Sequence, residues 1–384
     1  MEKNNPEITL VKYRLSCAGG LEKQAFRIAK AFSRRNIRVK VLTAQGSLNP
    51  IHYPLIEVKK LSLPKKICSF QKIKAFDKAC QLNLKTSPSS IVFGLDRTSH
   101  LTHIRAGLGV HAAYLKRRKK QDNFLKRQFF SLNPLHRTLL SLEKKAFENP
   151  SLKGVFTNSF MVKNEILEHY KISDKKIHVI HNGVEWHELK KPFSEWLNLK
   201  NVVASNLNLD PFLFHFLFVG SGYKRKGVDL LLKAFACLKN EEVHLSIVGQ
   251  EKEIKSYMEL SHRLKLGHKV SFFGAQKDVT PFYQLADALV IPSLYDPNAN
   301  VTIEALAMGL KVISSKFNGG SELINRENGL VIENLFDKDS LVKTLKMALD
   351  FPKTWMNSQR IRESVKQFDF QIQLDKMVNL TLNP

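Results

Sequence analysis

The chain has 384 residues, 43% of them hydrophobic and 25% charged, which suits two or three globular domains. This composition excludes a disordered, collagen-like or fibrous protein, and no apolar run approaches the roughly 18 residues of a membrane-spanning helix. The net charge of +25 is uneven, because residues 1–180 carry 35 Lys and Arg against 12 Asp and Glu, whereas residues 181–384 carry 25 against 23. This asymmetry predicts an anionic partner for the first half.

The first half of the chain alternates apolar runs with helical periodicity. Residues 8–15 predict a buried strand, a glycine turn follows, and residues 21–35 place apolar side chains on one helical face. Residues 38–43 predict the next strand. A strand, a helix and a strand in this order predict a βαβ unit and a parallel sheet. Further strands are predicted at 91–94, 154–157 and 177–181.

The same pattern restarts after residue 200. Helices are predicted over 228–238 and near 254–264, between strands at 212–220, 243–249, 270–274, 288–293 and 311–315. Two doubly wound α/β domains are therefore predicted, joined by a crossover within 181–210. We expect the first domain to cover residues 1–183 and the second residues 184–357. A C-terminal helix over about 358–384 is expected to pack back on the first domain.

The cysteines and the N-terminus bear on the compartment. Four cysteines lie far apart with no CxxC pair, which argues against a disulfide framework or a structural zinc: Cys17, Cys68, Cys80 and Cys237. The first ten residues lack the charged-then-apolar pattern of a secretory signal. We therefore expect a protein of the reducing cytosol.

Ligands of open α/β sheets bind beyond the carboxyl ends of strands, so the loops there are the candidate sites. Gly19 and Gly20 open a helix whose backbone N–H groups can face an anion, although a plain tight turn explains them equally well. The loop at 219–229 (VGSGYKRKGVD) places Arg225 and Lys226 after a strand. These cations suit a diphosphate, and a solvated basic turn is the alternative.

Two more loops carry polar residues in a suggestive pattern. In 295–309 (YDPNANVTIEALAMG), Asp296 and Glu304 are eight residues apart. Helix N-capping can explain Asp296 or Asn300, but it does not explain an acid at Glu304 within an otherwise small and apolar helix face. His111 follows glycines in the basic half; a lone histidine is more often structural than functional.

These segments resemble, in order, the retaining family-4 glycosyltransferases over about residues 8–350. The resemblance rests on GGLEKQAFRIAKAF, GVHAAYLKRR, GVFTNSFMVK, VIHNGV, FVGSGYKRKGVDLLLKAF, SIVGQ, VSFFGAQKDV, ADALVIPSLYDPNANVTIEALAMGLKVISS and FNGGSELI. Within the family, the VGS…RKGVD loop and the GGL opening look most like those of the lipopolysaccharide core glucosyltransferases.

The resemblance implies the GT-B fold, in which two Rossmann-like domains face a central cleft, and a nucleotide-sugar donor with neither a catalytic metal nor another cofactor. Arg225 and Lys226 match the family positions that stabilise the leaving diphosphate. Asp296 matches the acid near the donor sugar, and His111 matches the histidine-bearing loop that faces this sugar. The implied donor-binding residues are Gly19, Gly20, Gly220, Gly249, Asn300, Val301 and Glu304, of which Glu304 matches the acid that holds the ribose.

Two departures from the family pattern affect substrate choice. The first acid of the family's Glu-x7-Glu is Asp296 here, and the Asp that often follows GGL by three positions is Gln24. We expect retaining transfer of a hexose, glucose from UDP-glucose, to a lipid-linked acceptor such as lipopolysaccharide core. A nucleotide-sugar epimerase and an inactive GT-B binding protein remain alternatives. A nucleic-acid partner is disfavoured because no recognition motif or stacking platform is present.

The basic half also predicts where the protein works. Basic and apolar residues mix over 59–66, 72–78 and 116–127, which suits an anionic bilayer at roughly 1 kcal/mol per basic residue. Charge that serves only solubility is the alternative, but it would not select one domain. We expect peripheral binding to the inner face of the cytoplasmic membrane. The candidate membrane and acceptor residues are Lys116, Arg117, Arg118, Lys119 and Lys120.

Overall fold

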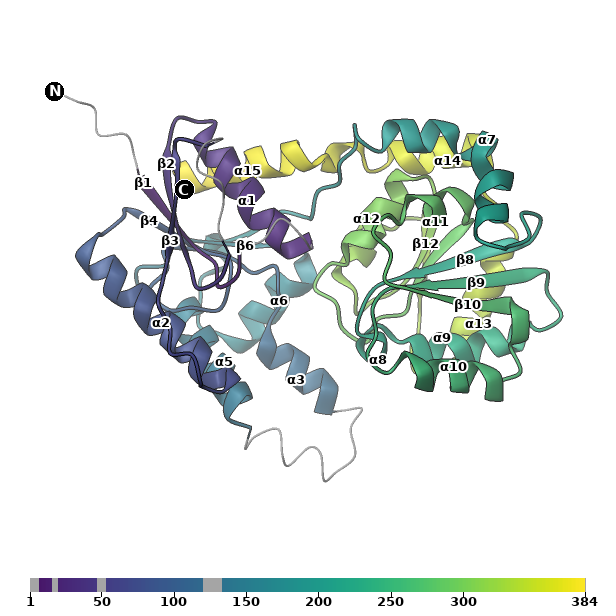
Figure 1. Ribbon diagram of the computed structural model, residues 1–384, viewed down its shortest axis with the longest axis horizontal. Coiled ribbons are helices and arrows are strands. Elements are labelled where there is room, and N and C mark those ends of the chain that lie inside the picture. Colours follow the sequence, from purple (N-terminus) through teal and green to yellow (C-terminus); the bar gives the residue numbers. More distant parts are fainter. Residues whose placement is uncertain (1–6, 16–19, 47–52, 120–132, 384) are drawn as a thin grey trace. The chain divides into compact units, whose positions relative to one another are not determined.

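The structure, a computed structural model, describes residues 7–15, 20–46, 53–119 and 133–383 and divides into two compact units. The first unit comprises the chain up to Ile180 together with the C-terminal residues from Leu374, and the second is His181–Gln373. Each unit is an open β-sheet with helices packed against it (Figure 1). The two doubly wound α/β units predicted from the sequence are therefore confirmed.

Within its described residues, the first unit has a seven-stranded parallel sheet in the order β3-β2-β1-β4-β5-β6-β7. The strands are β1 (Glu7–Val11), β2 (Arg38–Thr43), β3 (Ile56–Lys60), β4 (Ile91–Gly94), β5 (His103–Arg105), β6 (Gly154–Thr157) and β7 (Ile177–Val179). The central strands are continuous apolar runs because helices cover both faces of a parallel sheet. The strand order reverses between β1 and β4.

The helices of the first unit include α1 (Gly20–Ser33), α2 (Ser69–Thr86), α3 (His111–Lys119), α5 (Pro134–Phe147) and α6 (Phe160–His169). Of these, α5 and α6 begin at side-chain caps. Asn133 caps α5 ahead of Pro134, and the Ser159 hydroxyl accepts a hydrogen bond from the Val162 amide at the start of α6. No helix in the described part of the chain is long and apolar enough to cross a membrane.

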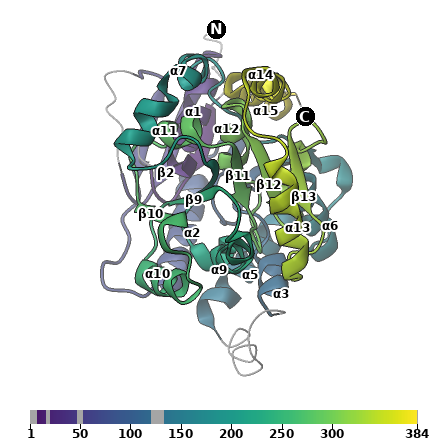
Figure 2. The ribbon, with the colours of Figure 1, turned by 90° about the vertical axis from the view of Figure 1, so that its right-hand side faces the viewer.

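The second unit, which is described throughout, has a six-stranded parallel sheet in the order β10-β9-β8-β11-β12-β13. The strands are β8 (Phe214–Val219), β9 (Val243–Val248), β10 (Val270–Gly274), β11 (Ala288–Ile291), β12 (Lys311–Ser315) and β13 (Gly329–Ile332). Figure 2 shows β11, β12 and β13 side by side. The strand order reverses between β8 and β11, as it does between β1 and β4 in the first unit.

Helices cover both faces of this second sheet, with α9 and α10 on one side and α11 and α12 on the other (Figure 1). The helices of the unit are α7 (Lys190–Asn206), α8 (Tyr223–Lys226), α9 (Val228–Phe235), α10 (Ile254–Arg263), α11 (Thr280–Leu285), α12 (Asn300–Ala307), α13 (Lys338–Leu349) and α14 (Trp355–Glu363). One continuous core fills the space between sheet and helices, including Phe216, Leu245 and Leu289.

The C-terminal segment differs from the expected single helix over 358–384. It forms two helices, α14 and α15 (Phe370–Leu382), and the chain up to Gln373 remains in the second unit. Only the part from Leu374 belongs to the first unit, where the Arg35 guanidinium donates to the Asn379 side chain at 2.8 Å. The first unit ends at Ile180, three residues before the expected boundary.

Candidate functional site

The sheet of the second unit presents its candidate site at the edge where β8 and β11 end. Because the strand order reverses between these neighbours, the loops that follow them diverge and leave room for a ligand. The loop after β8 leads through Gly220 into α8, which carries Arg225 and Lys226. The loop after β11 carries Asp296. The fold therefore brings together three residues that the sequence predicted as catalytic.

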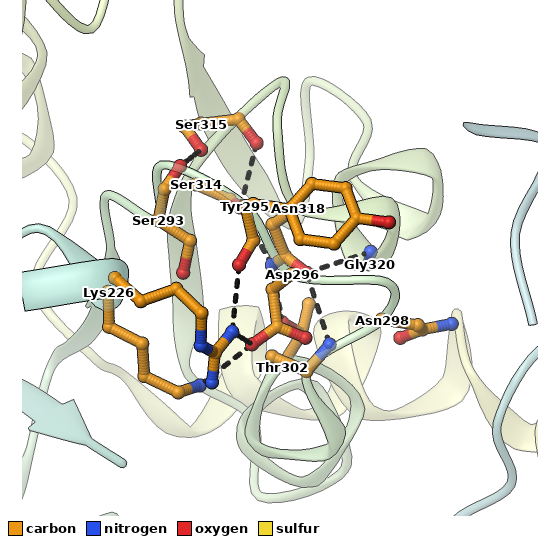
Figure 3. Close-up of polar contacts among 12 residues, drawn as sticks. Lys226, Ser293, Tyr295, Asp296, Asn298, Thr302, Ser314, Ser315, Asn318 and Gly320 are labelled. Atoms are coloured by element: carbon orange, nitrogen blue, oxygen red, sulfur yellow. Dashed lines mark hydrogen bonds and ion pairs between the residues drawn. The ribbon is translucent and has the colours of Figure 1, made fainter. Parts of the chain in front are cut away.

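Asp296 forms ion pairs with both cations. Its Oδ2 atom lies 3.0 Å from Arg225 Nη1 and 3.1 Å from Lys226 Nζ. Figure 3 shows the Lys226 and Asp296 side chains pointing toward one another. Burial alone would raise the pKa of Asp296, but Lys226 and Arg225 outweigh burial and hold that pKa below its ordinary value. The carboxyl group is therefore ionised at neutral pH.

The two cations differ in exposure. The Lys226 side chain is 9% exposed, whereas 37% of the Arg225 side chain is accessible. Arg225 Nη1 also donates to the Tyr295 carbonyl oxygen at 2.7 Å, which ties α8 to the loop after β11. A guanidinium has five N–H donors, so Arg225 retains donors for an anion. Lys226 thus offers a fixed ammonium group, and Arg225 offers a planar guanidinium that is partly accessible.

Gly220 and Gly249 let the backbone approach closely beneath these cations. Gly220 has φ of +154°, and a Cβ there would lie 2.6 Å from the Lys226 Cδ atom. Gly249 has φ of +140°, and a Cβ there would lie 2.1 Å from the Gly220 carbonyl oxygen. Both glycines are therefore required by the packing of the loops. Their predicted contact with a ligand stays a prediction.

A buried asparagine, Asn318, organises the loop that carries Asp296. Its Oδ1 atom accepts hydrogen bonds from the amides of Ala299 (3.1 Å) and Gly320 (3.0 Å), and its Nδ2 atom donates to the Thr302 and Ser314 hydroxyls (Figure 3). The Asp296 amide donates to Phe317 O at 2.9 Å. Sequence reasoning missed Asn318, because its only signal was its place in FNGG after a predicted strand.

Glu304 lies in α12, which follows this loop. Its Oε2 atom accepts a hydrogen bond from the Tyr283 hydroxyl at 3.0 Å, and Tyr283 is buried in α11. Burial and the neighbouring Glu304 carboxylate raise the pKa of Tyr283, so the phenol stays protonated and donates. Glu304 itself is half-buried, which leaves it able to meet a ligand as well.

The start of α12 differs from the capping alternative. The N-cap position is Ala299, without a side-chain hydrogen bond, so neither Asp296 nor Asn300 caps the helix. Asn300 instead accepts a hydrogen bond from the Asn182 side-chain amide at 2.7 Å, and Val301 packs against the core. Donor binding by Asn300 and Val301 stays a prediction.

In the first unit, His111 is the first residue of α3 and is buried. Its amide donates to Glu143 Oε1 at 2.7 Å, and its Nε2 atom lies 3.1 Å from the Nδ1 atom of His136. Burial, then Arg97 and His136, lower the pKa of His111 to about 3, so the ring is neutral at physiological pH. No sequence pattern predicted that Glu143, a buried acid on α5, would be the partner of this helix start.

The predicted basic cluster of α3 is partly neutralised. Lys116 Nζ lies 2.5 Å from Glu168, and Arg117 Nη2 lies 2.8 Å from Glu165, both on α6. Arg118 Nη1 lies 3.4 Å from the Tyr114 hydroxyl. Lys119 is exposed. Lys116 and Arg117 are therefore paired with acids of α6, and membrane or acceptor contact by this cluster stays a prediction.

Two of the predicted site residues lie outside the described residues: Gly19 and Lys120. Gly20 is the first residue of α1, as predicted for a glycine that opens a helix. Among the described residues, no group of three or more His, Cys, Asp or Glu side chains is arranged to hold a metal ion.

Two protein-family models match this chain, one in each half. The model described as Glycosyltransferase Family 4 matches residues 18–187, and the model described as Glycosyl transferases group 1 matches residues 205–367. The chain is 27% identical over 354 residues to the lipopolysaccharide glucosyltransferase WaaG of Escherichia coli K12, covering 88% of each chain. It is 32% identical over 116 residues to the lipopolysaccharide core biosynthesis glycosyltransferase LpsE of Rhizobium meliloti 1021, covering 30% of this chain and 34% of LpsE.

The crystal structure of WaaG, a glycosyltransferase involved in lipopolysaccharide biosynthesis, shares the fold. Its TM-score to this structure is 0.80 at 22% identity, covering 98% of this chain and 100% of WaaG. The predicted GT-B class of two Rossmann-like domains is thereby confirmed. The chain belongs to the group 1, family 4 glycosyltransferases and is a transferase related to the lipopolysaccharide core glycosyltransferases.

Proposed function

We propose that this protein transfers a hexose, glucose, from UDP-glucose to a lipid-linked saccharide such as lipopolysaccharide core, with retention of anomeric configuration and without a catalytic metal. The observation that carries the proposal is the convergence of Arg225, Lys226 and Asp296 where β8 and β11 end. The similarity to WaaG and LpsE supports the donor and acceptor classes.

The two cations have the chemistry that a leaving diphosphate requires. As the bond between the anomeric carbon and the diphosphate oxygen breaks, negative charge grows on the phosphate oxygens. Lys226 is already held in place by Asp296, so little reorganisation is needed when that charge develops. Arg225 offers a bidentate contact to the same oxygens. Losing one such preorganised donor typically costs about 3–4 kcal/mol of transition-state stabilisation.

The remaining groups orient the sugar and the nucleoside. The sugar passes through an oxocarbenium-like state, the acceptor hydroxyl attacks from the face the diphosphate leaves, and a departing phosphate oxygen takes the hydroxyl proton. Asp296 orients the sugar hydroxyls, and His111 stays a predicted contact of the donor sugar. Glu304, held by Tyr283, accepts hydrogen bonds from the ribose. Gly19 and Gly20 stay predicted contacts of the donor phosphates through their backbone amides.

The donor class can be tested by thermal shift with UDP, GDP and ADP and their glucose conjugates. We expect UDP and UDP-glucose to raise the melting temperature, because a ligand at 100 times its Kd adds about 2.7 kcal/mol to stability. Transfer from UDP-glucose, with its α-anomeric carbon, is then followed by NMR of the product in the presence of a chelator. An α-linked product supports the mechanism. A β-linked product, an epimerised nucleotide sugar, or binding with no transfer would refute it.

A further inference from the structure

The first unit contains a charge pair at the position equivalent to the candidate site of the second. Lys12 is the first residue after β1, and Asp96 is the second residue after β4. These are the first and fourth strands of the first unit, and the strand order reverses between them. In the second unit, Lys226 and Asp296 follow the first and fourth strands, β8 and β11. Each unit therefore has a Lys–Asp pair at its own switch point.

The geometry of the first pair is well defined. Lys12 Nζ lies 2.8 Å from Asp96 Oδ1, and the Tyr13 amide donates to Asp96 Oδ2 at 2.7 Å. The Lys12 side chain is 9% exposed and that of Asp96 is 19% exposed. Both carboxylate oxygens are thus held from one side, which fixes the orientation of the carboxyl plane while part of the group remains accessible.

A largely buried ion pair such as Lys12–Asp96 adds little stability that a well-packed apolar pair could not provide. Desolvating two charges is expensive, and replacing a buried ion pair by well-packed apolar residues is often neutral or stabilising. Stability alone therefore gives no reason for a charged pair at the end of β1 and β4. A carboxylate has about four lone-pair sites, and the two contacts leave Asp96 with capacity for further hydrogen bonds.

The ligand class follows from the chemistry of Asp96 and the space beside it. The partly open pocket that Asp96 lines with Arg97, Arg105 and Glu143 measures about 30 Å³, which is too small for a sugar ring. A ligand must therefore lie on the accessible side of the carboxylate, beyond the strand ends. An oriented carboxylate that accepts two hydrogen bonds suits neighbouring hydroxyl groups of a saccharide.

We propose that Asp96 is a specificity-determining residue that holds the saccharide acceptor by accepting hydrogen bonds from its ring hydroxyls, and that Lys12 is its positioning residue. This inference rests on the proposed glycosyl transfer and names the acceptor-binding group of the first unit. Removal of the Asp96 charge weakens acceptor binding and leaves donor binding to the second unit intact.

The test is calorimetric titration of the full-length protein with two probes, lipid-free lipopolysaccharide core oligosaccharide and UDP-glucose. Asp96→Asn is expected to weaken oligosaccharide binding tenfold or more while UDP-glucose affinity stays within twofold. Asp96→Glu recovers part of the loss, and Lys12→Met weakens oligosaccharide binding in the same direction. The matched control is Asp174→Asn, an acid of the first unit before β7, at the opposite edge of the sheet.

The outcomes separate this inference from the proposed function. A loss of oligosaccharide affinity below tenfold in Asp96→Asn, a parallel loss of UDP-glucose affinity, or a wild-type protein that does not bind the oligosaccharide overturns the inference. Absence of transfer by a wild-type protein that binds both probes refutes the proposed function alone. Melting temperatures identify a purely structural role, in which both affinities and stability fall together.

Discussion

Lys226 forms an ion pair with the Asp296 carboxylate, and it is also proposed to bind the leaving diphosphate. At 3.1 Å, Asp296 fixes the ammonium and at the same time offsets part of its charge. Asp296 also pairs with Arg225, so the three groups together carry one net positive charge. The arrangement gives a buried lysine an ion-pair partner when no ligand is bound and leaves a surplus of positive charge for a ligand.

The first prediction concerns this triad. Lys226→Met should lower kcat about 10²–10³-fold, because one preorganised donor to the leaving group is lost. It should also reduce the free energy of unfolding by about 2–3 kcal/mol, since a buried carboxylate loses one charged hydrogen-bond partner. Steady-state kinetics and urea denaturation measure the two effects. Lys233→Met, which removes an exposed lysine on α9, controls for net charge.

A double variant separates stability from catalysis. Lys226→Met combined with Asp296→Asn removes the carboxylate that has lost its lysine partner, so stability should return toward that of the wild type while activity does not. If Lys226→Met kept kcat within a few-fold of wild type, the assignment of Lys226 to the leaving group would be wrong.

Among individual residues, the sequence predicted Arg225, Lys226, Asp296 and Glu304 as site residues, because each lies in a loop or helix start after a predicted strand. It did not predict their partners. Asn318 and Tyr283 reach the site through the packing of other elements, and nothing in their local pattern distinguishes them from ordinary core or turn residues. Pairwise contacts between distant segments are set by tertiary structure, which periodicity does not encode.

Among the elements, the strands with continuous apolar runs were predicted to within a few residues, as with Arg38–Thr43 and Lys311–Ser315. Three strands were missed: β3, β5 and β13. β3 and β13 lie at the sheet edges and include exposed residues, and β5 has only three residues. Short or edge strands carry too few buried positions to stand out from a loop.

Buried histidines within the elements predict how stability depends on pH. His103 in β5 has its pKa lowered to about 4 by burial, and His111 and His244 have theirs lowered to about 3, again chiefly by burial. The unfolded chain therefore binds protons more readily than the folded one. The stabilisation is complete above a pH of about 6.5 and is lost as the pH falls, toward 4 for His103 and toward 3 for His111 and His244, at about 1.4 kcal/mol per pH unit for each histidine.

This second prediction can be measured by urea denaturation at pH 7, 6 and 5. The wild type should lose stability steadily over this range. His244→Gln keeps a hydrogen-bonding group beside the Ser271 hydroxyl, 3.0 Å from His244 Nε2, but cannot titrate. His244→Gln should therefore reduce the pH dependence of the free energy of unfolding of the second unit by the contribution of one histidine. An unchanged slope in His244→Gln would show that this residue does not contribute.

For the whole molecule, the charge asymmetry is the property that the fold class does not explain. The excess positive charge is in the first half of the chain. Helix α3 contributes only part of it at the surface, because Lys116 and Arg117 form ion pairs with acids of α6. Exposed lysines remain on and after β3 and along α2: Lys59, Lys60, Lys65, Lys66, Lys74 and Lys78. None of them belongs to an ion pair in the part of the chain that the structure describes.

The third prediction places the proposed peripheral membrane contact on this surface. A lysine near an anionic bilayer contributes about 1 kcal/mol, so each lysine changed to glutamine should weaken vesicle binding about fivefold. Changing Lys59, Lys60, Lys65 and Lys66 together should therefore abolish flotation with phosphatidylglycerol vesicles at moderate salt. The matched control changes four exposed lysines of the second unit, Lys239, Lys252, Lys255 and Lys265, and should float like the wild type. Because the attraction is electrostatic, added salt should release the wild type as well. Equal wild-type binding to neutral and anionic vesicles, or equal losses in the two quadruple variants, would contradict a membrane-facing role for the first unit.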